Sequence, residues 1–112
     1  MSQAPRPCEK VFLSHELADM LDRYDRSHKY WKWINKMGDD ILYNREVGQK
    51  ISKRKFPKSY VDRYGINNLY RYQHPEYYRS CYTLVMEKGI GICARILDLL
   101  THKEYNDLFG YE

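Results

Sequence analysis

The sequence has little of what builds disulfide scaffolds, membrane spans or metal sites. Its three cysteines, Cys8, Cys81 and Cys93, cannot all pair, and none belongs to a Cys-x-x-Cys motif. We therefore expect reduced cysteines packed in a core. We expect no metal and no cofactor, because no spacing of cysteine and histidine matches a known zinc site.

Long apolar stretches are also missing from the sequence. No segment is long enough to span a bilayer, and the first residues, Met-Ser-Gln-Ala-Pro-Arg-Pro, lack the apolar run of a signal peptide. These absences predict a soluble, cytoplasmic protein that does not bind a membrane.

Tyrosine and positive charge are what the sequence has in excess. There are 12 tyrosines against 3 phenylalanines and 2 tryptophans, and 19 Lys and Arg against 15 Asp and Glu, for a net charge of +4. Tyrosine packs in cores, but it also stacks on bases and donates hydrogen bonds to phosphates. The modest positive charge permits an anionic partner without identifying one.

The hydrophobic pattern predicts a single domain over residues 10–112, preceded by a loose arm over residues 1–9. Ser14 is a good N-cap for a first helix over residues 15–26, and apolar residues at helical spacing indicate a second helix over residues 29–44. A short β-type run comes before these helices, at residues 10–13.

The second half of the chain has a β-type pattern. Strands are predicted at residues 69–73, 78–85 and 90–97, and a loop around Gly65 comes before them. A last short helix begins after Thr101, with Glu104 at the capping-box position. The predicted fold is α+β: a small antiparallel sheet in the order β-α-α-β-β-β-α, with the N-terminal helical hairpin packed on one face.

Arg79 is the candidate around which a site is built. Alternation places it mid-strand on the face that carries Cys81, where an arginine needs either a carboxylate to pair with or an anion to bind. Arg71 lies on the preceding strand, and a meander would bring His102 and Tyr105 close to both arginines. The alternatives stay open: Arg79 in a structural ion pair, His102 without a role, and Tyr105 as a packing residue.

These four residue types suit cleavage of RNA without a metal. A histidine can transfer the proton, while arginine stabilises the extra negative charge on phosphorus. A run of five cations with no acid among them is interpreted as an RNA-binding loop, although such a run can also be simply solvated. The five are Lys50, Lys53, Arg54, Lys55 and Lys58.

Three segments resemble the C-terminal half of the RelE/ParE superfamily of toxins from toxin–antitoxin systems. They are the run Asn68-Leu-Tyr-Arg-Tyr, the strand Tyr78-Arg-Ser-Cys-Tyr-Thr-Leu, and the closing Thr101-His-Lys-Glu-Tyr with Phe109-Gly-Tyr. The resemblance covers residues 10–111. It implies a metal-independent endoribonuclease that cleaves messenger RNA on the ribosome, inhibits translation and is neutralised by an antitoxin protein.

The resemblance also implies roles for single residues. Arg79 would contact the scissile phosphate, His102 would act as acid or phosphate ligand, and Tyr105, or less closely Tyr111, would orient the 2′-hydroxyl or stack on the base. Arg71 and the lysine run match the family's basic residues only loosely. Two alternatives on the same fold are a non-catalytic module that binds RNA or protein, and a ParE-type toxin directed at gyrase.

Overall fold

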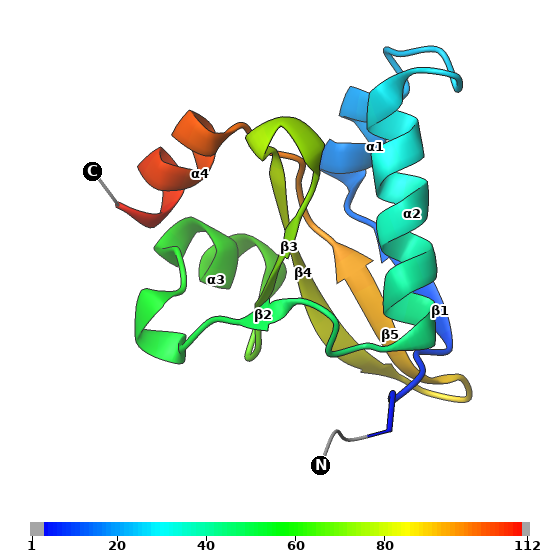
Figure 1. Ribbon diagram of the computed structural model, residues 1–112. Helices are drawn as coiled ribbons and strands as arrows, with labels where there is room; N and C mark the ends of the chain where they lie inside the picture. Colours follow the sequence, from blue (N-terminus) through cyan, green and yellow to red (C-terminus); the bar gives the residue numbers. More distant parts are fainter. Residues whose placement is uncertain (1–3, 111–112) are drawn as a thin grey trace.

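The computed structural model describes residues 4–110. Five strands make one mixed sheet in the order β1-β5-β4-β3-β2 (Figure 1). Strand β1 runs parallel to β5, and the other neighbouring pairs are antiparallel. The strands are β1 Lys10–Leu13, β2 Gln49–Lys50, β3 Tyr70–Gln73, β4 Arg79–Glu87 and β5 Gly91–Ile96.

Four α-helices pack against this sheet: α1 His15–Leu21, α2 Lys29–Tyr43, α3 Lys58–Tyr64 and α4 His102–Phe109. The predicted cap of α1 is confirmed, because the Ser14 hydroxyl accepts a hydrogen bond from the Leu17 N–H. The capping box of α4 is also confirmed, between Thr101 and Glu104. Such caps satisfy N–H groups that the helix itself leaves unpaired, which is why they can be read from sequence.

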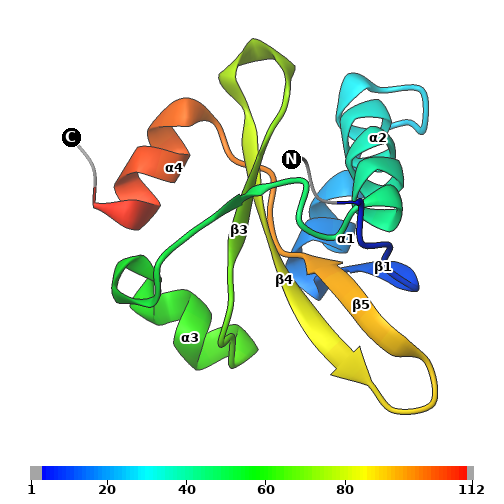
Figure 2. The ribbon, with the colours of Figure 1, turned by 60° about the horizontal axis from the view of Figure 1, so that its bottom comes forward.

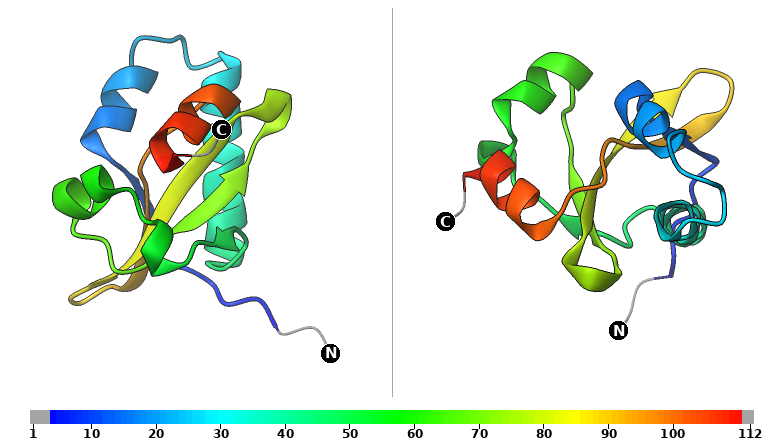
Figure 3. Two further views of the ribbon diagram at one scale, coloured as in Figure 1. Left: turned by 90° about the vertical axis from the view of Figure 1, so that its left-hand side faces the viewer. Right: turned by 90° about the horizontal axis from the view of Figure 1, so that it is seen from above.

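The helices cover both faces of the sheet (Figure 3). On one face, α1 and α2 bury Leu21, Met37 and Ile41 against sheet residues that include Tyr82. On the other face, α3 and α4 pack around Leu69 and other buried residues of a second cluster. The sheet is therefore a middle layer between two apolar cores, and a residue's position along a strand decides which core it joins.

The predicted fold class is wrong in three respects. The sheet is mixed rather than antiparallel, because β1 pairs with β5 in parallel. Helices lie on both faces rather than one, because the segment predicted as a loop around Gly65 contains α3. The first helix ends at Leu21 rather than at residue 26, so residues 22–28 separate α1 from α2 and the two do not form a closely connected hairpin.

The physical reasons for these errors differ. Gly65 takes the left-handed conformation that ends α3, with φ of 60°, and glycine in a loop and glycine ending a helix look alike in sequence. The two-residue strand β2 is too short to show alternation. The pairing of β1 with β5 joins residues far apart in the chain, which no local pattern specifies.

The tyrosine-rich segment forms the β3–β4 hairpin. Tyr70 faces Tyr82 across the two strands with ring centroids 5.1 Å apart, and both belong to the α1/α2 core. The turn contains Glu76 and Tyr77, both with positive φ. Arg79 begins β4 just after this turn, instead of lying within a strand as predicted. Most of these tyrosines therefore hold the hairpin against α2.

Figure 2 shows the turn between β4 and β5 extending away from the helices.

The predicted N-terminal arm, residues 1–9, lies partly outside the described residues, which begin at Ala4. Within the described part, the Cys8 N–H donates to the Leu42 carbonyl and the Glu9 N–H donates to the Ile92 carbonyl. The side chain of Cys8 is buried, as are those of the other two cysteines, and all three are unpaired thiols. Among the helices of residues 4–110, none is both long and apolar enough to cross a membrane.

Candidate functional site

Two arginines share one aromatic ring on the α3/α4 side of the sheet. The Cζ atom of Arg79 lies 4.9 Å from the centroid of the Tyr105 ring, and that of Arg71 lies 5.8 Å from the same centroid. In the β3–β4 hairpin, Arg71 is paired with Cys81, and Gln73 is paired with Arg79. Arg71 and Arg79 are thus near neighbours on the face that alternation assigns to them.

Helix α4 reaches the arginines through a bridge at the start of β4. The Arg79 N–H donates to the Leu100 carbonyl at 2.8 Å, and the Leu100 N–H donates back to the Arg79 carbonyl at 2.7 Å. The capping box at Thr101 then starts α4 at once. One turn into this helix, Tyr105 is placed under both guanidinium groups.

The charge of the two arginines is not balanced by any carboxylate among residues 4–110. No ion pair of the described chain includes Arg71 or Arg79. The Nε atom of Arg79 is buried and has no hydrogen-bond partner there. Arg71 donates from Nη2 to the Gln49 side-chain oxygen, a neutral partner on β2. A buried guanidinium N–H without an acceptor is costly, and no ion pair within residues 4–110 offsets that cost.

Tyr105 is a platform rather than an exposed contact surface. Its side chain is only 1% exposed, and its ring stacks on Phe109 with centroids 4.5 Å apart. It packs in the same core as Leu69 and Cys81. In this conformation the ring is covered, so its evident contribution is cation–π support for the arginines, worth about 0.5–2 kcal/mol for each.

His102 is exposed at the first position of α4. Its Nε2 lies 3.1 Å from the side-chain nitrogen of Asn106, one turn further along. It follows Leu100 by two residues, a span of at most about 7 Å, and Leu100 is bridged to Arg79. His102 is therefore a solvent-accessible proton donor or acceptor near the start of β4, although no described contact joins its ring to either arginine.

The predicted basic run lies on the same side of the sheet, at its β2 edge. Lys50 ends β2, and Lys53–Lys55 form a single turn of 3-10 helix. Lys58 begins α3 and pairs with Asp62 at 3.4 Å, with both side chains largely exposed, so this pair adds little stability. The other four cations have no ion pair within residues 4–110, and all four are exposed.

A hollow lies beside Arg71 at this edge of the sheet. It has a volume of about 320 Å³ and is lined by Gly48, Gln49, Arg71, Tyr72 and Gln73, with Val47 at its rim. Because β2 pairs with β3 next to Arg71, the exposed lysines that follow β2 continue the positive surface outward from the two arginines.

A buried carboxyl that was not predicted from the sequence, Asp98, contacts Cys81, the residue paired with Arg71 across the hairpin. Asp98 accepts hydrogen bonds from the Tyr60 hydroxyl and from the Cys81 N–H, the latter at 2.7 Å. Burial raises the pKa of Asp98 to about 6 and also raises the pKa of the Cys81 thiol. Cys81 therefore stays protonated and is no nucleophile here. The available signal was one carboxylate inside the apolar run Ile96-Leu-Asp-Leu-Leu.

Asp98 matters for the site because it does not neutralise Arg79. Its two oxygens are already occupied by Tyr60 and the backbone of Cys81. Tyr111, the less certain candidate, lies outside the described residues. In the part of the chain that the structure describes, no group of three or more His, Cys, Asp or Glu side chains is placed to hold a metal ion.

Comparison of the chain with models of known protein families, with curated proteins and with solved structures finds no match. The class of site therefore rests on its own geometry. That geometry is a pair of stacked, unneutralised arginines beside an accessible histidine, at the end of a strip of exposed lysines.

Proposed function

We propose that the protein is an RNA-cleaving enzyme of the toxin type, and that its site lies around Arg79. The observation that carries the proposal is the Arg79 guanidinium, which is held on the Tyr105 ring beside Arg71 without a described carboxylate partner. Two guanidinium groups can donate hydrogen bonds to the oxygens of a phosphodiester, and their combined charge suits the second negative charge that develops in the transition state. The exposed lysines beyond β2 supply contacts to the flanking phosphates.

The proposed reaction uses the substrate's own 2′-hydroxyl. Its oxygen attacks the neighbouring phosphorus, the bond from phosphorus to the 5′-oxygen breaks, and a 2′,3′-cyclic phosphate and a 5′-hydroxyl result. Arg79 stabilises the added negative charge on phosphorus, and His102 gives a proton to the departing 5′-oxygen. The 2′-hydroxyl proton passes to water. Tyr105 and Arg71 position Arg79.

Two carboxylates that could act as the base, Glu46 and Glu76, have partners elsewhere. Glu76 forms an ion pair with Lys29 at 2.8 Å at the hairpin tip, and Glu46 lies 3.9 Å from the Arg6 guanidinium. Neither has a described contact with Arg79. The proposed function therefore assigns the charge stabiliser and the acid, and it leaves removal of the proton to solvent.

The test is cleavage of a messenger on programmed ribosomes, with the ends of the products identified. We expect products with 2′,3′-cyclic phosphate and 5′-hydroxyl ends, which distinguishes this chemistry from metal-assisted hydrolysis. Arg79→Gln should lower the rate about a hundredfold or more, in line with loss of one oxyanion donor. His102→Gln should lower it by a similar factor. Arg23→Gln, at an exposed site between α1 and α2, is the matched control.

Binding without cleavage is the second candidate, and the burial of Tyr105 at 1% exposure favours it, since that ring cannot reach a base directly. In that case RNA would bind with a strong salt dependence and stay intact. Changing any one of Lys50, Lys53 or Lys55 to glutamine should then lower the slope of the logarithm of the RNA-binding constant against the logarithm of the salt concentration by roughly 0.7. If RNA stays intact at saturating protein, both on and off the ribosome, the cleavage proposal is refuted and the binding proposal is supported.

The partners proposed for this site follow from its charge. An antitoxin would cover the arginines and the lysine strip with an acidic segment. A gyrase-directed role predicts instead that the purified protein inhibits DNA supercoiling while messenger stays intact, and an assay of gyrase supercoiling separates the two.

A further inference from the structure

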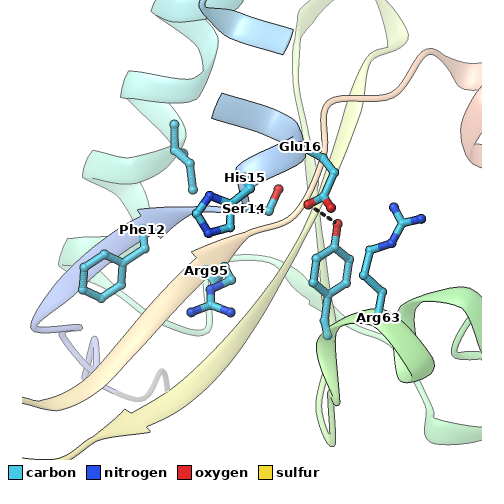
Figure 4. Close-up of a pocket in the computed structure, with 8 residues that line it drawn as sticks. Phe12, Ser14, His15, Glu16, Arg63 and Arg95 are labelled. Carbon is cyan, nitrogen blue, oxygen red and sulfur yellow. Dashed lines mark hydrogen bonds between the residues drawn. The ribbon is translucent and has the colours of Figure 1, made fainter. Parts of the chain in front are cut away.

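A second polar pocket lies on the same face of the sheet, on the other side of α3. It is formed where β1 and β5 meet the start of α1 and the end of α3, and its volume is about 320 Å³ (Figure 4). That volume is at the lower end of the range of about 300–1,000 Å³ for small-molecule sites. The lining residues used below are Phe12, His15, Glu16, Arg63, Tyr64 and Arg95.

Arg95 forms the floor of this pocket. It lies in the middle of β5, opposite Phe12 of β1 and Thr83 of β4. Neither neighbour carries a charge, and within residues 4–110 the half-buried Arg95 side chain makes no hydrogen bond or ion pair. A guanidinium in the middle of a sheet without a carboxylate beside it is unusual and favours an anionic ligand.

The rest of the lining contributes one further arginine, one histidine and one carboxylate. His15 lies close to Arg95 in Figure 4, and Arg63 stands at the other end of the pocket. The one carboxylate of the lining, Glu16, accepts a hydrogen bond from the Tyr64 hydroxyl at 3.2 Å. Glu16 is therefore held to one side, where it can accept hydrogen bonds from a ligand's hydroxyl or amino groups.

Aromatic rings stand at both ends of the floor. Phe12 is 37% exposed, which is high for a phenylalanine on a strand, and Tyr64 is partly buried at the end of α3. A planar ring can stack on such a side chain. The pocket thus offers an aromatic surface, arginine and histidine donors for a phosphate and a carboxylate for hydroxyl groups, within the space of one nucleotide.

We infer that this pocket binds a nucleotide unit with a single phosphate, either a free nucleoside monophosphate or one residue of an RNA chain. Arg95 and His15 hold the phosphate, Phe12 stacks on the base, and Glu16 accepts from the ribose hydroxyls. The pocket shares no residue with the site around Arg79, so the inference stands independently of the proposed cleavage.

The experiment titrates the full chain with adenosine monophosphate, adenosine and inorganic phosphate, monitored by amide NMR shifts. We expect adenosine monophosphate to bind at millimolar concentrations or below and to shift residues of β1 and β5. Arg95→Gln should weaken this binding about tenfold or more, as expected for a lost charge-assisted contact. Phe12→Leu should weaken binding of the nucleotide but not of inorganic phosphate.

Two further variants keep the result interpretable. His15→Gln changes an exposed residue and keeps the inference testable if the Arg95 variant fails to fold, and Arg23→Gln is the control for removal of one positive charge. Single-stranded RNA is the second arm: if the free nucleotide does not bind, Arg95→Gln must weaken RNA binding while Arg23→Gln does not. Unchanged affinity of the Arg95 and His15 variants in both arms, or an equal loss in the control, would overturn the inference.

Discussion

Asp98 gives the sharpest test of the structure, because the same buried carboxyl is tied to one hydroxyl and one backbone N–H. Its side chain is 8% exposed, and burial raises its pKa from 3.8 to about 6 despite hydrogen bonds from Tyr60 and Cys81 that act in the opposite direction. The folded protein therefore binds a proton here more tightly than the unfolded chain does. We predict that Asp98→Asn changes how stability depends on pH.

The sign and size follow from linkage. Because the folded pKa is the higher one, the contribution of Asp98 to stability is fully present below about pH 4 and is lost as the pH rises through 6. A shift of about two pKa units corresponds to about 3 kcal/mol. The asparagine variant carries no such charge, so its free energy of unfolding should gain up to about 3 kcal/mol relative to the wild type between pH 4 and pH 7.

The assay is urea unfolding of both proteins at several values of pH, followed by circular dichroism. The quantity compared is the difference between variant and wild type, since any other group that titrates contributes equally to both and cancels. A difference that stays constant from pH 4 to pH 7 would refute the assignment of Asp98 as a buried carboxyl with a raised pKa.

Three further outcomes are expected. Burial lowers the pKa of His74 to about 4, so its contribution to stability is present above pH 6.5 and is lost as the pH falls. The free energy of unfolding of the wild type should therefore decline by up to about 3 kcal/mol between pH 6.5 and pH 4 because of His74. His74→Gln should remove this decline, as measured by urea unfolding. Gly48→Ala would place a Cβ 2.6 Å from the Arg71 carbonyl and 2.7 Å from the Tyr82 ring, and should cost about 1–3 kcal/mol in the same assay. Thr101→Ala removes the α4 cap and should cost about 1 kcal/mol, while Thr101→Ser should retain most of it; equal losses for both would contradict the capping box.

Short-range signals in this chain were readable, and long-range ones were not. The caps at Ser14 and Thr101 and the apolar spacing of α2 each depend on residues within one or two turns, and the structure has them. Helix α3 was missed because its seven residues stand between Pro57 and a glycine, a composition that also suits a loop. The parallel partner of β1 was missed because it is more than eighty residues away, as the hydrogen bond from the Ser14 hydroxyl to the Leu97 carbonyl illustrates.

For the candidate site, the sequence supplied the residue types and the hairpin that places Arg71 beside Arg79. It could not say whether the anion facing Arg79 was internal. The internal candidate is Asp98, and in the folded protein its carboxylate accepts hydrogen bonds from the Tyr60 hydroxyl and the Cys81 N–H instead. The sequence also could not show that Tyr105 would be covered, since burial depends on how α4 lies against α3.

The sequence by itself determined the local elements, their order along most of the chain, and which strand residues share a face, because these follow from periodicity and from hydrogen bonds between near neighbours. Only the tertiary structure decided that the sheet is mixed and covered on both faces. It alone put two arginines on one ring without a described counter-ion, and left Arg95 in a pocket with no carboxylate beside it on the sheet. Such charge balance depends on which distant residues meet, and packing of the whole chain decides that.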